Sequence, residues 1–192
     1  PVPQLAAVVE APATSSDEVL QVAVEIDWER VQADALHQVK AIPLQPNDVN
    51  WGWGRIFEKP LIQGGTSAML IDPYQDKRHQ RRNLGEVIEH LRSNGSLRRI
   101  DVVTGKRGDP DDAEGDQQLR ELAAQLQQVG VELNWTRDSQ QHDRRLLLNN
   151  GVVFELGMGL DIYGPTRNLS ESNPSLRRIR KATRISVLKP AR

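Results

Sequence analysis

Residues 141–151 read Gln-His-Asp-Arg-Arg-Leu-Leu-Leu-Asn-Asn-Gly, and this stretch predicts the first strand of a β-hairpin together with its turn. Three leucines form the apolar part of the strand, and Asn150-Gly151 is a dipeptide that favours a tight hairpin turn. His142 and Arg144 lie two residues apart at the head of the strand, so alternation is expected to place them on one face. A histidine and a cation presented together in this way suit a phosphate or another oxyanion.

The sequence on both sides of this hairpin alternates between strand patterns and helix patterns. Apolar runs predict strands at 68–71, 100–103, 131–136, 144–149, 152–156 and 182–188. Helical spacing predicts helices at 76–93 and 115–129, the second with a buried face of Leu119, Leu122, Leu126 and Val129. Before these elements we expect a strand at 22–28, a short helix at 31–39 and a connection at 43–50. The order predicts an α/β fold with a mixed sheet.

The aromatic stretch at residues 51–57, Trp-Gly-Trp-Gly-Arg-Ile-Phe, has two interpretations. We favour a hydrophobic plug that packs against the sheet. The alternative is a surface anchor in which Trp51, Trp53 and Phe57 grip a partner protein or lipid headgroups.

The composition excludes several classes of protein. The chain has 192 residues, 38% of them hydrophobic and 27% charged, which is typical of a soluble globular domain. It has no cysteine, which excludes disulfides and thiolate chemistry and suits a cytoplasmic location. The four histidines show no metal-binding spacing, so we expect neither a metal nor a cofactor. Because the chain does not begin with methionine, we expect a piece of a longer protein, with a flexible linker at 1–18 and one domain at 19–192.

Positive charge is concentrated in two segments, although the net charge is only −1. Residues 167–192 contain eight Lys and Arg residues and one acid, Glu171. The candidate ligand-binding residues there are Arg177, Arg178, Arg180, Lys181 and Arg184. A second cluster at the start of helix 76–93 comprises Lys77, Arg78, Arg81 and Arg82. The two clusters form either one basic face for an anionic lipid surface, nucleic acid or acidic protein, or two unrelated solvated runs.

A further group of candidate ligand-binding residues follows the predicted strand 68–71. Asp72 and Tyr74 come at the carboxyl end of that strand, where α/β folds place ligand groups. The alternative is that Asp72 satisfies free amides at the start of the next helix. His79 and Gln80 are expected to organise this corner, and Gln80 needs a partner because it lies on the apolar stripe of helix 76–93.

Four sequence blocks together resemble the phospholipase-D-like C-terminal domain of MIT-domain-containing proteins, which are ESCRT-associated adaptors. The blocks lie at 51–57, 72–84, 142–151 and 157–161, followed by a similar basic strand at 180–187. The resemblance extends over about 49–190. It implies a phospholipase-D-like sandwich, with a mixed sheet flanked by helices, and a homodimer that binds acidic phospholipids, including phosphoinositides, as a peripheral membrane protein.

The same resemblance makes His142, Arg144 and Asn149 a degenerate form of the phospholipase D pattern HxKxxxxD. Active enzymes of that group combine two copies of the pattern, whereas this chain has one, and Arg144 and Asn149 replace the lysine and the aspartate. We therefore expect a catalytically inactive pseudoenzyme, in which His142 holds the loop 157–161 or Asp72 by hydrogen bonds.

Two other functions stay open. A dimer that shares His142 would be a phosphodiesterase or nuclease. A protein-interaction module would grip an acidic partner through the aromatic stretch or the basic strand, as part of a larger protein such as one with an ATPase domain. Nucleic acid is the less expected ligand, because few aromatic residues lie among the basic ones.

Overall fold

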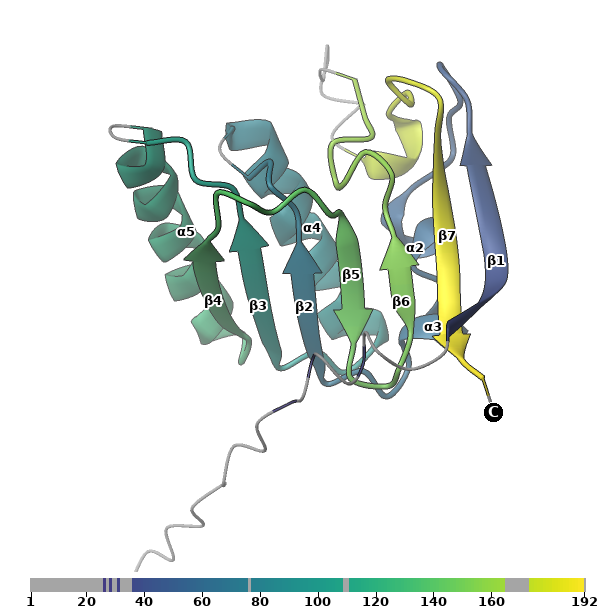
Figure 1. The fold of residues 1–192 in the computed structure, drawn as a ribbon, viewed down its shortest axis with the longest axis horizontal. Helices are drawn as coiled ribbons and strands as arrows, with labels where there is room; N and C mark the ends of the chain where they lie inside the picture. The colour runs from purple at the N-terminus through teal and green to yellow at the C-terminus, as the bar shows by residue number, and fades with distance from the viewer. Residues whose placement is uncertain are drawn as a thin grey trace, which may run out of the picture.

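The computed structural model describes residues 26, 28, 31, 36–75, 77–108, 111–164 and 173–191. The expected linker at 1–18 and most of the expected strand at 22–28 lie outside these residues. Within the described part of the chain, the strands form one seven-stranded sheet in the order β1-β7-β6-β5-β2-β3-β4 (Figure 1). The α/β class and the mixed sheet are confirmed, since β2, β3 and β4 are parallel neighbours and the other pairs are antiparallel.

The strand bounds agree closely with the hydrophobic pattern in the second half of the chain. The strands are β1 (Leu36–Leu44), β2 (Ser67–Ile71), β3 (Arg99–Thr104), β4 (Glu132–Arg137), β5 (Arg145–Leu148), β6 (Val153–Glu155) and β7 (Thr183–Pro190). The β5–β6 hairpin turns at Gly151, whose φ of 85° is a conformation that glycine adopts without strain. The hairpin predicted from 144–156 is therefore present.

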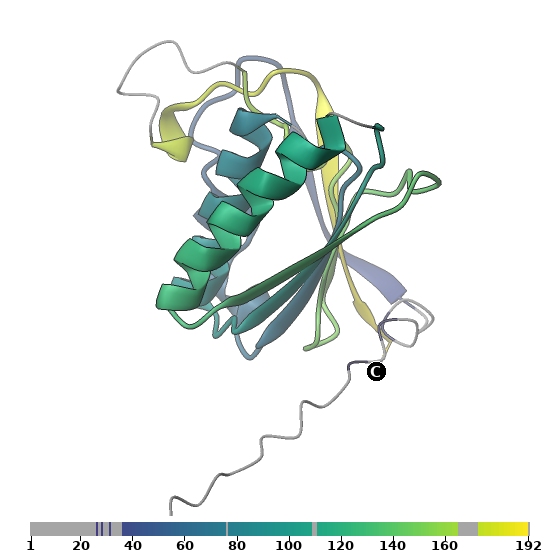
Figure 2. The same ribbon diagram turned by 90° about the vertical axis from the view of Figure 1, so that its left-hand side faces the viewer.

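The helices lie against one face of the sheet. They are α2 (Trp53–Ile56), α3 (Lys59–Ile62), α4 (Arg78–Asn94) and α5 (Asp111–Gln128), and a 3₁₀ turn, η2, covers Pro174–Leu176. Figure 2 shows α4 and α5 side by side on the same side of the twisted sheet. The main hydrophobic core fills the space between them and the sheet, with Leu70, Ile100 and Leu146 from the strands and Leu84 and Ile88 from α4.

Two details of the helix predictions are wrong for reasons of local geometry. The expected helix at 31–39 is strand from Leu36 onward, because the segment pairs with β7 and places Ile42 and Leu44 in the core. Val129 is 44% exposed, because α5 ends at Gln128 and the chain turns away from the helix axis. Leu119 and Leu126 occupy the buried face as expected.

The aromatic stretch at 51–57 is the predicted hydrophobic plug. Trp53 and Phe57 are buried, and the Phe57 ring packs edge-on against Phe154 at a centroid distance of 4.9 Å. Because both side chains are buried, they cannot contact a partner. The alternative prediction, a surface anchor that includes Trp53 and Phe57, is therefore wrong. Trp51 is half-buried, and the Arg55 guanidinium lies 3.8 Å from the centroid of its ring.

Candidate functional site

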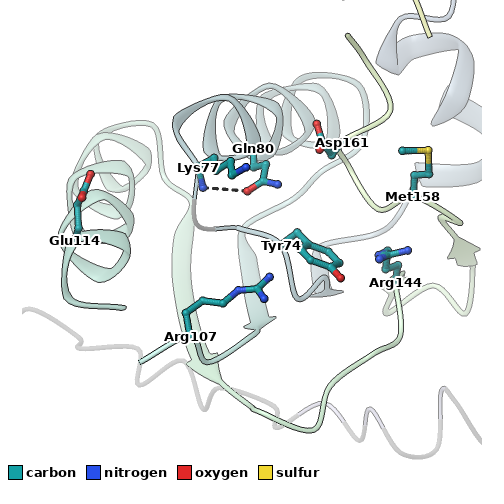
Figure 3. Close-up of a pocket in the computed structure, with 8 residues that line it drawn as sticks. All are labelled: Tyr74, Lys77, Gln80, Arg107, Glu114, Arg144, Met158 and Asp161. Atoms are coloured by element: carbon teal, nitrogen blue, oxygen red, sulfur yellow. Dashed lines mark hydrogen bonds between the residues drawn. The ribbon is translucent and has the colours of Figure 1, made fainter. Parts of the chain in front are cut away.

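The candidate site is a cavity of about 650 Å³ where the carboxyl ends of β2 and β3 meet the start of β5. Its lining residues are Tyr74, Lys77, Gln80, Arg107, Glu114, Arg144, Met158 and Asp161 (Figure 3). Tyr74 and Lys77 come from the connection between β2 and α4, and Arg107 follows β3. The carboxyl edge of parallel strands is where α/β folds gather ligand-binding side chains.

Asp72 directly follows β2 and connects the end of this strand to the loop after β6. Its carboxylate is buried and accepts hydrogen bonds from the backbone N–H of Leu160 (3.0 Å) and Tyr74 (3.1 Å) and from Gln75 Nε2 (3.1 Å). Burial raises the pKa of Asp72 to about 6, although these hydrogen bonds and the nearby charge of Arg144 oppose the shift. Asp72 therefore ties the loop at 157–160 to the end of β2. The alternative that it satisfies helix amides is wrong, because α4 begins only at Arg78.

Tyr74 lies between two guanidinium groups. The Arg107 and Arg144 carbons Cζ are 5.0 Å and 4.8 Å from the centroid of its ring, and Figure 3 shows the ring between the two arginines. Arg144 Nη1 donates to the carbonyl of Gly157 (2.7 Å), whereas its buried Nε donates to no group in the described part of the chain. Arg107 Nη2 donates to the carbonyl of Pro73 (3.4 Å). Cation–π contacts hold both positive charges at the wall of the cavity.

The start of α4 supplies the wall opposite Arg107. Gln80 is buried, and its Oε1 accepts a hydrogen bond from the Lys77 N–H (2.9 Å), so the partner that its burial requires is present. Arg81 is also buried, and its Nη1 donates to the Gln75 carbonyl (3.1 Å). Of this predicted basic cluster, Lys77 lines the cavity and Arg81 supports the loop beneath it.

A second cavity of about 410 Å³ adjoins the first and shares Lys77 and Asp161 with it. The other residues of the second cavity are His79, Arg82, Asn83, Tyr163, Gly164, Arg177 and Arg180. The Asp161 carboxylate lies 3.2 Å from His79 Nε2 and 3.2 Å from Arg180 Nη1. The two basic clusters of the sequence therefore meet in space at this cavity.

The predicted basic residues of the C-terminal segment separate into different environments. Arg177 is buried, and its guanidinium donates to both oxygens of Glu86 (2.6 and 2.9 Å) and to Asn83 Oδ1 (3.2 Å). The expectation that Arg177 belongs to an exposed basic face is therefore wrong, because its charge is neutralised inside the fold. Arg178 and Lys181 are exposed and line neither cavity. Arg184 projects from β7 and donates to Gln38 Oε1 on β1 (3.2 Å).

The three residues of the degenerate catalytic pattern do not converge within one chain. His142 is exposed and precedes β5, so the alternation argument that paired it with Arg144 does not apply. Its side chain makes no hydrogen bond to the described residues; the bond to the 157–161 loop comes from Arg144 instead. Asn149 follows the other end of β5, where its Oδ1 accepts from the N–H groups of Thr66 (2.9 Å) and Ser67 (3.2 Å). Asn149 therefore fixes the entry to β2.

Arg107 is the site residue that the sequence interpretation missed. It lies in a polar loop that has no hydrophobic period, and the acids that follow it obscured its charge. Its position three residues after the end of β3 was the available signal, because the ends of neighbouring parallel strands share one edge of the sheet.

In the described part of the chain, no group of three or more His, Cys, Asp or Glu side chains is arranged to hold a metal ion. None of the helices in that part of the chain is long and apolar enough to cross a membrane.

Comparison with known proteins identifies a family and a relative of this chain. Residues 51–189 match the family described as "Phospholipase D-like domain at C-terminus of MIT". The chain is also similar to MIT domain-containing protein 1 of Mus musculus, with 27% identity over 125 residues. That alignment covers 65% of this chain and 50% of the mouse protein, so the chain spans about half the length of this relative.

Proposed function

The chain belongs to the family of phospholipase-D-like domains found at the C-terminus of MIT proteins, and from this premise we propose that it is a catalytically inactive module that binds the phosphate-bearing headgroups of acidic phospholipids. Binding of this kind targets a longer protein to a membrane surface. We also expect the module to act as a homodimer, because two copies on one membrane bind with greater avidity than one.

The placement of Arg107 and Arg144 on either side of Tyr74 carries this proposal. With Lys77 they bring three cations to the wall of one cavity, against the two carboxylates of Glu114 and Asp161. Guanidinium groups bind phosphate oxygens through paired, charge-assisted hydrogen bonds. A volume of about 650 Å³ falls within the usual range of small-molecule sites, so a headgroup fits the cavity.

The surface beside the cavity supports a membrane rather than a freely diffusing ligand. Arg178 and Lys181 are exposed on either side of Arg180, which lines the adjoining cavity. Basic residues that approach an anionic bilayer each contribute about 1 kcal/mol to binding. A headgroup in the cavity and these exposed cations would therefore act on the same lipid surface.

We infer that the module is not a catalyst from the surroundings of His142. A nucleophilic histidine needs a neighbouring group that orients its ring and a cation that binds the phosphate beside it. The imidazole of His142 is exposed, has no hydrogen-bond partner among the described residues and does not line the cavity that holds Arg144. The residues that would bind a phosphate are thus separated from the residue that would attack it.

Co-sedimentation with lipid vesicles tests the proposal. We expect binding to vesicles that contain an acidic phospholipid, weaker binding at higher salt, and no binding to neutral vesicles. The double variant Lys77→Ala/Arg107→Ala removes two cavity cations and should lower binding about tenfold. Arg120→Ala removes one exposed cation on α5 outside both cavities; it is the control for a positive charge lost elsewhere on the surface and should bind almost as the wild type does. Equal binding of all three proteins would refute the role of the cavity.

A soluble competitor distinguishes the two sources of phosphate. Glycerol phosphate at millimolar concentration should displace the protein only partly, if the bilayer contributes through Arg178 and Lys181. Complete displacement, together with unchanged binding of Arg178→Ala/Lys181→Ala, would identify a soluble phosphate ligand and would overturn the membrane proposal.

A further inference from the structure

We propose that Asp161 is an internal competitor for the anionic ligand: its carboxylate occupies the second cavity in place of a phosphate, and a ligand must displace it to reach His79 and Arg180. The inference rests on the proposed function, because the second cavity adjoins the proposed headgroup site and shares Lys77 and Asp161 with it. The ligand class is a phosphomonoester.

The Asp161 carboxylate lies between the imidazole of His79 and the guanidinium of Arg180. Its two carboxylate oxygens lie 3.2 Å from His79 Nε2 and 3.2 Å from Arg180 Nη1. The same side chain lines both cavities together with Lys77. Figure 3 shows it at the end of the first cavity that lies beside α4 and Gln80. A phosphate group that bridged these two side chains would take the position of the carboxylate.

Arg177 and Arg180 line the second cavity and pair with acids, and the two pairs differ in how readily they can exchange. Arg177 is 3% exposed and binds Glu86 through two short hydrogen bonds, so this pair is part of the core. The side chains of His79 and Arg180 are 54% and 48% exposed, and that of Asp161 is 17% exposed. Water already competes for pairs of this kind, which contribute little to stability. The Asp161 pairs are therefore the ones that a ligand can replace.

Charge decides which ligand can replace a carboxylate. Asp161 carries one negative charge, as does a phosphodiester, so exchange between them brings no electrostatic gain. A phosphomonoester carries about −1.5 to −2 at neutral pH and has three strong acceptor oxygens. It therefore interacts more strongly with Arg180 and the shared Lys77 than the carboxylate does. Asp161 would thus select headgroups that end in a phosphomonoester.

The test compares two variants that each remove one negative charge. Asp161→Asn keeps the shape of the side chain and an oxygen that can accept from Arg180. Asp143→Asn is the matched control, because Asp143 is exposed and directly precedes Arg144 without lining either cavity. Each protein is titrated in solution with glycerol phosphate and with dimethyl phosphate, while NMR follows the side-chain signals of His79 and Arg180.

We expect the wild-type signals to move with the monoester and to stay fixed with the diester. Asp161→Asn should bind the monoester roughly 3- to 10-fold more tightly, since no exposed ion pair has to be broken. Asp143→Asn should change that affinity less than about twofold. Equal tightening in both variants would show a simple charge effect and overturn the inference, as would an unchanged affinity of Asp161→Asn. The thermal midpoints of all three proteins establish that each is folded.

The vesicle experiment separates this inference from the proposed function. Vesicle binding by the wild type with no effect of Asp161→Asn would refute only the competitor role. A response of His79 and Arg180 to the soluble monoester, without any binding to acidic vesicles, would support the competitor role and refute membrane binding.

Discussion

The buried carboxyl of Asp72 should give the protein a pH-dependent stability of unusual sign. Its pKa is raised from 3.8 to about 6 by burial. Between these two pH values the folded state binds the proton and the unfolded state does not, so stability falls as the pH rises. Since one pKa unit corresponds to about 1.36 kcal/mol, the full loss is about 3 kcal/mol, of which about 2 kcal/mol falls between pH 4.5 and 7.5.

The variant Asp72→Asn isolates this one group from every other titrating group in the chain. The amide has nearly the same shape and retains an oxygen that can accept from the Leu160 or Tyr74 N–H, but it does not titrate. Urea denaturation at pH 4.5, 5.5, 6.5 and 7.5 gives the free energy of unfolding of both proteins. We expect the wild type to lose about 2 kcal/mol relative to Asp72→Asn across this range.

The reasoning would be refuted by parallel pH profiles of the two proteins, or by a wild type that gains stability relative to the variant as the pH rises. Asp143→Asn serves as the control, because it removes one carboxyl from the exposed surface and leaves Asp72 in place. Absolute stabilities differ through lost hydrogen bonds, so the comparison uses the change with pH and not the value at one pH.

Three further predictions concern packing and catalysis. In urea denaturation, Gly159→Ala should lower the free energy of unfolding by about 2 kcal/mol or more, because Gly159 has φ 66° and an added Cβ would meet the Asp72 carboxylate. Gly64→Ala is the control: Gly64 has φ 80° but open space around it, so the loss should be about half as large. Phe57→Ala should cost about 3–5 kcal/mol in urea denaturation, and a loss below 1 kcal/mol would contradict its place in the core. His142→Ala should leave stability and vesicle binding unchanged, and neither it nor the wild type should hydrolyse bis(p-nitrophenyl) phosphate; activity of the wild type that is lost in the variant would establish the phosphodiesterase alternative.

Local sequence determined most of the secondary structure, because the signals involved act within one element. The stripe of Leu84, Val87, Ile88 and Leu91 on α4 faces the hydrophobic core of the protein, as helical spacing predicts. The Asn150-Gly151 turn closes the hairpin, and short apolar runs become β2, β3 and β4. The order of these elements was enough to predict a mixed α/β sheet. The residues Asp72, Tyr74 and Gln80 were also correctly placed in one corner, since they follow one strand end.

Tertiary structure decided which charged side chains line the cavities and which are buried in ion pairs inside the fold. Arg177 and Arg180 look alike in the sequence, yet the first is buried against Glu86 and the second faces a cavity beside Asp161. Likewise, the strand character of Leu36–Leu44 depends on pairing with β7, and Asp72 finds a partner in Leu160, 88 residues along the chain. Burial and ion pairing join residues that are distant in sequence, so no local pattern can reveal them. The site is therefore a product of the sheet that brings these segments to one edge.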